Sequence, residues 1–227
     1  MVNQRKVLVV AVHPDDETLG CGGTLLRHKA NGDAVHWMIV TSIQKQYGFT
    51  DSAVEVRRQE IAAVSSIYDF DGVYELDFPT MQLDVIPKSR LVDSISYVVN
   101  HIEPDIVYLP FKGDIHTDHQ LAFQVAYSCT KSFRYPSIKK IVMMETISET
   151  EFAPAIKEDS FIPNMFVDIS EFINRKIEIM RIFRSEIGKH PFPRNEKNIR
   201  ALATLRGATA GCEYAEAFMI LKEIISV

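Results

Sequence analysis

The sequence of 227 residues predicts an α/β fold with three layers, a mostly parallel, Rossmann-like sheet with helices on both faces. Short apolar runs rich in Val and Ile alternate along the chain with longer segments of helical period. Such alternation favours parallel strands, because two parallel strands need a long crossover connection, which is usually a helix. The composition, 46% hydrophobic and 24% charged, is that of a globular protein with a substantial core. We therefore expect a single domain over residues 1–227.

The order of elements follows from the apolar runs and the periodic segments between them. The predicted strands are Lys6–Val12, Val35–Thr41, Val73–Leu76, Asp105–Pro110 and Ile138–Met144. The predicted helices between them are Thr18–Ala30, Ser52–Tyr68, Lys88–Ile102 and His116–Thr130. The C-terminal part, 165–227, is expected to add helices to the same domain at Ser170–Ser185, Asn195–Arg206 and Tyr214–Ile225. The loop 146–164 has no strong period and is expected to form a lid or an edge of a substrate site.

The first predicted helix contains three glycines. Thr18 can cap this helix, and an Asn-Gly pair can end it. Gly20, Gly22 and Gly23 would each cost roughly 1 kcal/mol against alanine inside a helix. That cost indicates that another part of the chain packs closely against the start of the helix.

Charge and composition exclude several classes of partner. The net charge is -5 and the lysines and arginines are scattered, so no broad basic surface for nucleic acid is expected. No segment approaches the roughly 20 apolar residues of a membrane span, and the short apolar run at the N-terminus lacks a cleavage site. The three cysteines are far apart and form no Cys-x-x-Cys motif. We expect a cytoplasmic protein without membrane anchor or export signal.

Two clusters of histidines and acidic residues follow predicted strands. V-H-P-D-D-E-T, residues 12–18, comes directly after the first strand, and G-D-I-H-T-D-H, residues 113–119, follows the fourth. Each cluster alone has an ordinary explanation, helix capping for the first and a surface turn for the second. Ligands of an open parallel sheet, however, bind beyond the carboxyl ends of its strands. The joint placement of both clusters at strand ends therefore indicates a site.

The side chains of these clusters suit a metal-dependent hydrolase. Zinc is bound by imidazoles and carboxylates, and a catalytic zinc site needs three protein ligands and an open fourth position. Further carboxylates can accept a proton from water or orient an imidazole. The same ligands could also hold Fe(II), Mn(II) or Co(II), because affinity and availability both decide which metal is bound.

These motifs resemble those of the LmbE/PIG-L family of zinc-dependent N-acetyl-sugar deacetylases. V-H-P-D-D-E-T followed by G-C-G-G-T is similar to the N-terminal signature of that family, and H-T-D-H, residues 116–119, is similar to its second metal motif. V-R-R-Q-E, residues 56–60, and the order of elements to about residue 145 also match. The resemblance thus covers most of the chain.

The resemblance implies a role for each matched position. It implies one zinc ion per chain, held by His13, Asp16 and His119. It implies that Asp15 is the general base, and that His116 stabilises the oxyanion or protonates the leaving amine, with Asp118 as the partner that orients it. Arg57 matches an arginine that contacts the substrate in some members.

A further substrate contact is predicted in L-R-G-A-T-A-G-C-E-Y, residues 205–214. Arg206 offers a planar guanidinium, and Tyr214 offers an aromatic face and a hydroxyl, to a sugar or a phosphate. The alternative is a helix boundary with a solvated face. Similar segments in relatives that resemble sugar-modifying enzymes favour the substrate contact.

The predicted function is zinc-dependent removal of the acetyl group from an N-acetylated amino sugar, free or on a nucleotide, lipid or aglycone carrier. An amidase acting on a non-sugar N-acyl metabolite would use the same machinery. L-G-C-G-G, residues 19–23, also resembles the glycine loop of S-adenosylmethionine-dependent methyltransferases, although H-P-D-D-E-T separates it from the strand. The complete set of ligand and base residues argues against a non-catalytic sugar-binding module. The sequence is compatible with a homo-oligomer.

Overall fold

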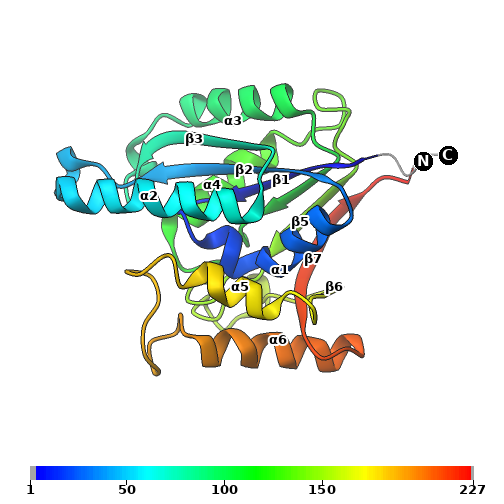
Figure 1. Cartoon of the computed structure of the whole chain (residues 1–227). Helices are drawn as coiled ribbons and strands as arrows, with labels where there is room; N and C mark the ends of the chain where they lie inside the picture. Colours follow the sequence, from blue (N-terminus) through cyan, green and yellow to red (C-terminus); the bar gives the residue numbers. More distant parts are fainter. Residues whose placement is uncertain (1–3, 226–227) are drawn as a thin grey trace.

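A seven-stranded mixed sheet forms the centre of the computed structural model, which describes residues 4–225 (Figure 1). The strands are β1 (Lys6–Ala11), β2 (Ala34–Ser42), β3 (Gly72–Pro79), β4 (Ile106–Leu109), β5 (Lys140–Met144), β6 (Met165–Asp168) and β7 (Ala215–Glu223). The helices are α1 (Asp16–Ala30), α2 (Asp51–Tyr68), α3 (Lys88–Ile102), α4 (Thr117–Ser128), α5 (Ile173–Met180) and α6 (Glu196–Ala210). The predicted fold class is confirmed. The ends of the predicted domain, residues 1–3 and 226–227, lie outside the described residues.

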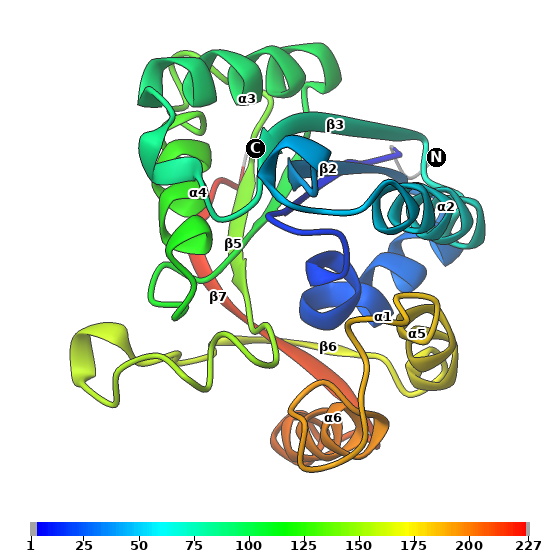
Figure 2. The ribbon, with the colours of Figure 1, turned by 90° about the vertical axis from the view of Figure 1, so that its left-hand side faces the viewer.

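The order of strands creates a crevice at one edge of the sheet. The order is β3-β2-β1-β4-β5-β7-β6, in which β1 to β5 are parallel and β7 is antiparallel to both of its neighbours. The chain passes from β1 to β2 on one side, whereas β4 pairs with the other side of β1. The carboxyl ends of β1 and β4 therefore flank a switch point, where open α/β sheets bind ligands. Figure 2 shows this edge of the sheet.

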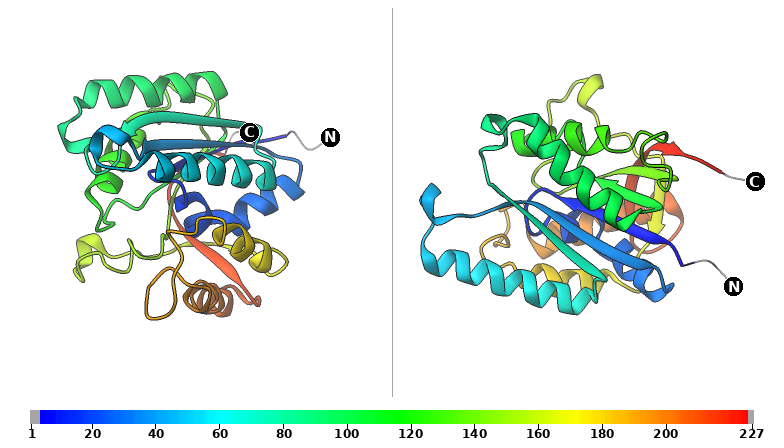
Figure 3. Two further views of the ribbon diagram at one scale, coloured as in Figure 1. Left: turned by 60° about the vertical axis from the view of Figure 1, so that its left-hand side comes forward. Right: turned by 90° about the horizontal axis from the view of Figure 1, so that it is seen from above.

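Helices cover both faces of the sheet, as the alternating side chains of β1 require. Val7 and Val9 belong to a buried cluster with side chains of α1, α2, α5 and α6, whereas Leu8 and Val10 belong to another with side chains of α3 and α4. All four are almost fully buried, because β1 lies inside the sheet between two layers of helices. Figures 2 and 3 show α3 and α4 on one side and α1, α2 and α5 on the other.

The helix predicted at Tyr214–Ile225 is wrong, because this segment contains strand β7. Its Ala, Glu, Leu and Lys residues favour a helix by intrinsic propensity. Pairing with both β5 and β6 overrides that preference and buries Phe218 completely. The F-M-I-L run within it was the available signal, since a short apolar run is compatible with a buried strand. Strand β6 was not predicted, and only part of Ser170–Ser185 is the α-helix α5.

Helix α1 is broken at Cys21, whose backbone angles of φ -148° and ψ 21° are not helical. The break leaves backbone carbonyl and N–H groups of α1 without helical hydrogen bonds, and the buried ion pair of Lys176 and Glu216 bonds to them. Lys176 Nζ donates to the Leu19 carbonyl at 2.9 Å and to Glu216 Oε1 at 2.7 Å. Glu216 also accepts the amide N–H groups of Gly23 and Thr24, at 2.9 and 2.7 Å. The second half of α1 is thus capped by a side chain of β7.

The glycines of α1 allow its close contact with other elements. A Cβ atom on Gly22 would lie 2.6 Å from the Tyr68 hydroxyl, and one on Gly23 would lie 2.7 Å from a carbon of Ile169. Both approaches are shorter than real Cβ contacts allow. The close packing expected from the sequence is therefore present, and the glycines are buried beneath the loop that follows β1. Among residues 4–225, no helix combines the length and apolar composition that crossing a bilayer requires.

Candidate active site

The loop after β1 is folded around the carboxylate of Asp16. Asp16 Oδ2 accepts the backbone N–H groups of Val12 at 3.0 Å and of His13 at 2.8 Å. These bonds close the loop and place the His13 ring above the start of α1. His119 reaches the same point from the first turns of α4, on the other side of the switch point.

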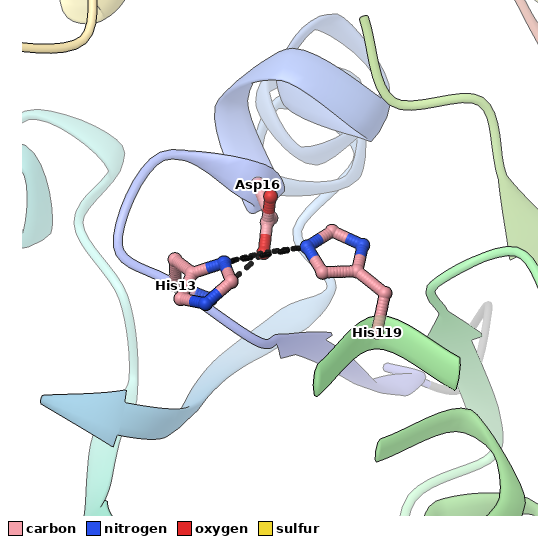
Figure 4. A group of neighbouring side chains, drawn as sticks. All are labelled: His13, Asp16 and His119. Atoms are coloured by element: carbon pink, nitrogen blue, oxygen red, sulfur yellow. Dashed lines mark hydrogen bonds and ion pairs between the residues drawn. The ribbon is translucent and has the colours of Figure 1, made fainter. Parts of the chain in front are cut away.

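His13, Asp16 and His119 form a group with the spacing of metal ligands (Figure 4). His119 Nε2 lies 3.3 Å from Asp16 Oδ2 and 3.3 Å from His13 Nδ1, and His13 Nδ1 lies 3.8 Å from Asp16 Oδ2. Two ligands bound at about 2.0–2.1 Å to a tetrahedral zinc ion lie roughly 3.3 Å apart. Two of the three distances match this spacing and the third exceeds it by about 0.5 Å, so the donor set is one that can hold a zinc ion after a small adjustment of the side chains.

Asp114 orients His119, a role that the sequence reasoning missed although Asp114 lies inside the quoted second motif. Asp114 Oδ2 bonds His119 Nδ1 at 2.9 Å, and Asp114 Oδ1 accepts the Thr150 hydroxyl at 2.6 Å. The side chains of both Asp114 and His119 are fully buried. Burial alone would lower the pKa of His119, but the carboxylates of Asp16 and Asp114 raise it. The pair holds Nε2 toward Asp16 and His13, which is the arrangement that carboxylates give to zinc-binding histidines.

The carboxylate of Asp118 is bonded to backbone N–H groups and lies near His13, and His116 belongs to the same close group, so the role of Asp118 in orienting His116 stays a prediction. It accepts the N–H groups of Met81 at 2.6 Å and Leu83 at 3.3 Å, and its Oδ2 lies 3.6 Å from His13 Nε2. Only the backbone of Asp118 bonds His116: its N–H donates to His116 Nδ1 at 3.1 Å. The cause is helix capping, because His116 is the N-cap of α4.

That backbone bond defines the state of His116. Since Nδ1 accepts a hydrogen bond, the proton of the neutral ring is on Nε2. Burial, together with the neighbouring His13 and His119, lowers the pKa of His116 to about 4. A neutral ring with its proton on Nε2 can donate a hydrogen bond from that atom.

Asp15 lies next to the candidate metal ligands with its side chain almost fully buried. Its φ of 141° is rare for a residue with a side chain, and such outliers concentrate at functional sites. Burial, with the neighbouring carboxylates of Asp16 and Glu186, raises its pKa well above the usual value. A carboxyl with a raised pKa is a stronger base than an exposed one once it is ionised.

A cavity of about 260 Å³ opens beside these residues. It is lined by acidic and basic groups, by His116, and by apolar side chains: His13, Pro14, Asp15, Asp16, Leu19, Thr41, Ile43, Phe49, Arg57, Thr80, Met81, His116, Ser148, Glu149, Glu186 and Arg194. The volume suits a small molecule, and the mixture of polar and apolar walls is typical of ligand sites. The loop 146–164 contributes Ser148 and Glu149 to one edge, and its action as a lid stays a prediction.

Arg57 lines the cavity, but its guanidinium is occupied by the protein. It donates to the Pro14 carbonyl at 2.8 Å and to the Ser185 hydroxyl at 3.1 Å, and it pairs with Glu186. Arg194 binds the other oxygen of Glu186 at 3.0 Å. These pairs brace the loop after β1 against the segment before α6, and no local pattern in the sequence indicated Glu186 or Arg194.

The structure does not bring Arg206 or Tyr214 to this cavity. Arg206 forms a bidentate pair with Glu145, at 2.9 and 2.5 Å. Tyr214 packs against the buried cluster beneath the sheet, and its N–H donates to the Ser170 hydroxyl at 3.2 Å. Arg206 lies in α6, and Tyr214 directly precedes β7, whose pairing with β5 and β6 holds this segment in the sheet.

Glu17 is fully buried under the same loop, and burial raises its pKa to about 8. The native state therefore holds a proton on Glu17 that the unfolded chain loses above about pH 4.3. Its contribution to the free energy of unfolding must fall as pH rises from that value toward 8. In protein stripped of metal by a chelator, we expect the stability of Glu17→Gln relative to the wild type to increase steadily from pH 5 to 8. Urea unfolding at each pH measures this difference, and a constant difference would contradict it.

A family model described as PIG-L, GlcNAc-PI de-N-acetylase, matches residues 8–130. This is more than half of the chain, and it includes both metal motifs. The chain belongs to the PIG-L family. It is thus a hydrolase of the N-deacetylase type.

Individual relatives extend the match to nearly the whole chain. A diacetylchitobiose deacetylase from Thermococcus kodakarensis is 26% identical over 223 residues, which cover 93% of this chain and 81% of the relative. Among solved structures, a conserved protein from Thermus thermophilus has a TM-score of 0.77 and 27% identity, covering 99% of this chain and 98% of that one. The 4-carboxy-2-hydroxymuconate hydratase from Pseudomonas putida KT2440 has a TM-score of 0.75 at 18% identity, covering 99% of each chain. That last similarity is one of fold alone, and its different reaction shows why function must be argued from the site.

Proposed function

We propose that this N-deacetylase uses one zinc ion per chain to remove the acetyl group from an N-acetylated amino sugar, free or on a nucleotide, lipid or aglycone carrier. The observation that carries the proposal is the geometry of the metal ligands. The potential ligand atoms of His13, Asp16 and His119 all lie within 4.8 Å of one another, and Asp15 lines the cavity beside them. This is the combination that metal-assisted amide hydrolysis needs.

The residues of the cavity divide the work of hydrolysis. A zinc ion held by the three ligands would supply a lowered pKa for water and polarisation of the amide carbonyl. Asp15 accepts a proton from the attacking water, for which its raised pKa suits it. His116 donates its Nε2–H to the carbonyl oxygen as negative charge develops there. The carbon–nitrogen bond then breaks, and the proton taken by Asp15 passes to the leaving amine, so that acetate and a free amino sugar are released.

The sugar substrate is supported by the comparisons and by the cavity together. The family description refers to an N-acetylglucosaminyl lipid, and the Thermococcus relative is named for an N-acetylated disaccharide. Hydroxyl groups of a sugar need donors and acceptors, and the Ser148 hydroxyl and the Glu149 carboxyl place such groups on the cavity wall. Phe49 and Met81 add apolar surface for a sugar face.

The test is a screen of the purified protein, loaded with zinc, for amine release from N-acetylated compounds. We expect N-acetylglucosamine or N,N′-diacetylchitobiose to release a primary amine, detected with fluorescamine, and expect removal of zinc by dipicolinate to stop the release. N-acetylated amino acids serve as the comparison set. Hydrolysis of the amino acids without hydrolysis of any sugar would reject the sugar and leave the alternative amidase.

A further inference from the structure

Glu17 lies outside both the group of candidate metal ligands and the cavity wall. Its side chain is fully buried, yet it belongs to no metal-ligand group and does not line the cavity. The three consecutive acidic residues therefore have three different surroundings. Asp15 lines the cavity, Asp16 lines it and also lies among the candidate metal ligands, and Glu17 is buried with its carboxyl bonded to the Asp15 N–H.

The carboxyl of Glu17 bonds directly to the backbone of the proposed base. Glu17 Oε2 accepts the Asp15 N–H at 3.0 Å. On the other side of the same residue, the Asp15 carbonyl accepts the N–H groups of Thr18 at 3.0 Å and Leu19 at 2.8 Å, as the first turn of α1. The peptide groups before and after Asp15 are thus each held by a hydrogen bond.

These bonds account for the unusual backbone at Asp15. The angle φ describes rotation about the N–Cα bond, so fixing the peptide on each side of Asp15 fixes φ at its observed 141°. A residue with a side chain leaves such a conformation unless its surroundings hold it there. Both Asp15 and Asp16 line the cavity, but only Asp16 belongs to the group of candidate metal ligands.

Glu17 is itself supported from below. The Thr18 hydroxyl donates to Glu17 Oε1 at 2.6 Å, and the Tyr68 hydroxyl donates to Thr18 Oγ1 at 3.2 Å. Tyr68 is buried and stacks on Phe70, so the end of this chain of bonds is rigid. Gly22 leaves the space that the Tyr68 hydroxyl needs.

We propose that Glu17 is a positioning residue, which holds the Asp15 N–H and thereby keeps the Asp15 carboxyl in the cavity. The proposal rests on the proposed function, which makes Asp15 the base. Glu17 acts through Asp15 and touches neither the metal nor the substrate.

The test compares Glu17→Met, which keeps the size and loses the acceptor, with Glu17→Gln, which keeps an acceptor oxygen. For Glu17→Met we expect one zinc per chain and an unchanged KM for N,N′-diacetylchitobiose. We expect its kcat on that substrate to fall by about 10–100-fold, which is the usual effect of losing a residue that supports a metal site. We expect its Asp15 amide proton to move upfield in NMR spectra of the metal-free protein, because the hydrogen bond is lost. Glu17→Gln should keep most of the turnover and a wild-type amide shift.

The control is Asp33→Leu, which removes another buried carboxylate that accepts a backbone N–H, that of Arg5 at 3.3 Å. It should lower stability without changing kcat or the Asp15 amide. If Glu17→Met does not fold, Thr18→Val loosens Glu17 instead and should move the Asp15 amide in the same direction by less.

Three results would overturn the proposal. Glu17→Met could show wild-type turnover, it could lose zinc, or its Asp15 amide signal could stay at the wild-type position. Where Thr18→Val replaces Glu17→Met, an unchanged Asp15 amide signal in Thr18→Val is the third result. Failure of the proposed function has a different signature. Wild-type protein would then release no amine from the probe, while the NMR comparison would still report whether Glu17 holds Asp15.

Discussion

Asp15→Asn is expected to lower deacetylase turnover by about 10²–10⁴-fold at neutral pH while the protein retains one zinc ion per chain. The range is that of a general base removed from a hydrolytic site. Asparagine keeps the size of the side chain and its place in the cavity, but it cannot accept the proton of the attacking water. Two measurements on the same preparation check this prediction. Plasma mass spectrometry gives the zinc content, and kcat on N,N′-diacetylchitobiose gives the loss of turnover.

The adjacent residue is the comparison for this prediction. Asp16→Asn changes a ligand and a loop anchor, because Asp16 Oδ2 accepts two backbone N–H groups. It should weaken zinc binding as well as turnover. Equal losses of activity in both variants, with zinc fully retained in both, would contradict the assignment of separate roles to the two aspartates.

Asp16→Ala is expected to lose zinc at concentrations that saturate the wild type, because two histidines remain where a stable site needs three protein ligands. Asp114→Ala keeps all three ligands and removes only the carboxylate that orients His119. Loss of such a partner typically weakens metal affinity by about 10–100-fold. Competition with a fluorescent zinc chelator should therefore rank the variants as wild type, Asp114→Ala and Asp16→Ala, in order of decreasing affinity.

The chain offers a matched control for Asp114. His28 and Asp33 repeat the same arrangement, a histidine Nδ1 bonded to a buried carboxylate five residues away, at 2.6 Å. This pair is bonded to Tyr108 and Arg5 and belongs to no metal-ligand group among the described residues. Asp33→Ala should cost stability and leave zinc affinity unchanged. A loss of zinc equal to that in Asp114→Ala would show that general destabilisation, and not orientation of His119, causes the effect.

The fold class and the position of the site were predictable because they depend on local patterns. Strand β1 and the helices α2 and α3 have apolar periods that few alternatives satisfy, and the structure contains them close to the predicted bounds. The first motif directly follows β1, and the second begins four positions after the end of β4. Parallel strands bring their carboxyl ends to one edge, so His13 and His119 meet although 106 residues separate them.

The errors arise where a partner distant in sequence decides the outcome. The segment of β7 has good helix formers, and only pairing with β5 and β6 makes it a strand. Arg206 has the chemistry of a substrate contact, and only the position of Glu145 shows that its guanidinium is taken. The sequence also did not indicate that the Asp118 carboxylate accepts the N–H of Met81, 37 positions away, and lies near His13.

The sequence by itself determined the α/β order of elements to about residue 145, the two motifs and the family. Each of these follows from residues within a few positions of one another, whose effect on the backbone or on a ligand is local. Only the tertiary structure decided which surroundings each of the three consecutive acidic side chains has. Asp15, Asp16 and Glu17 have similar carboxyl groups, so their different surroundings come from the loop closed by Asp16, the support by Thr18 and Tyr68, and the histidine that arrives from α4. Hydrogen bonds and burial, which depend on packing between distant segments, separate groups that are chemically alike.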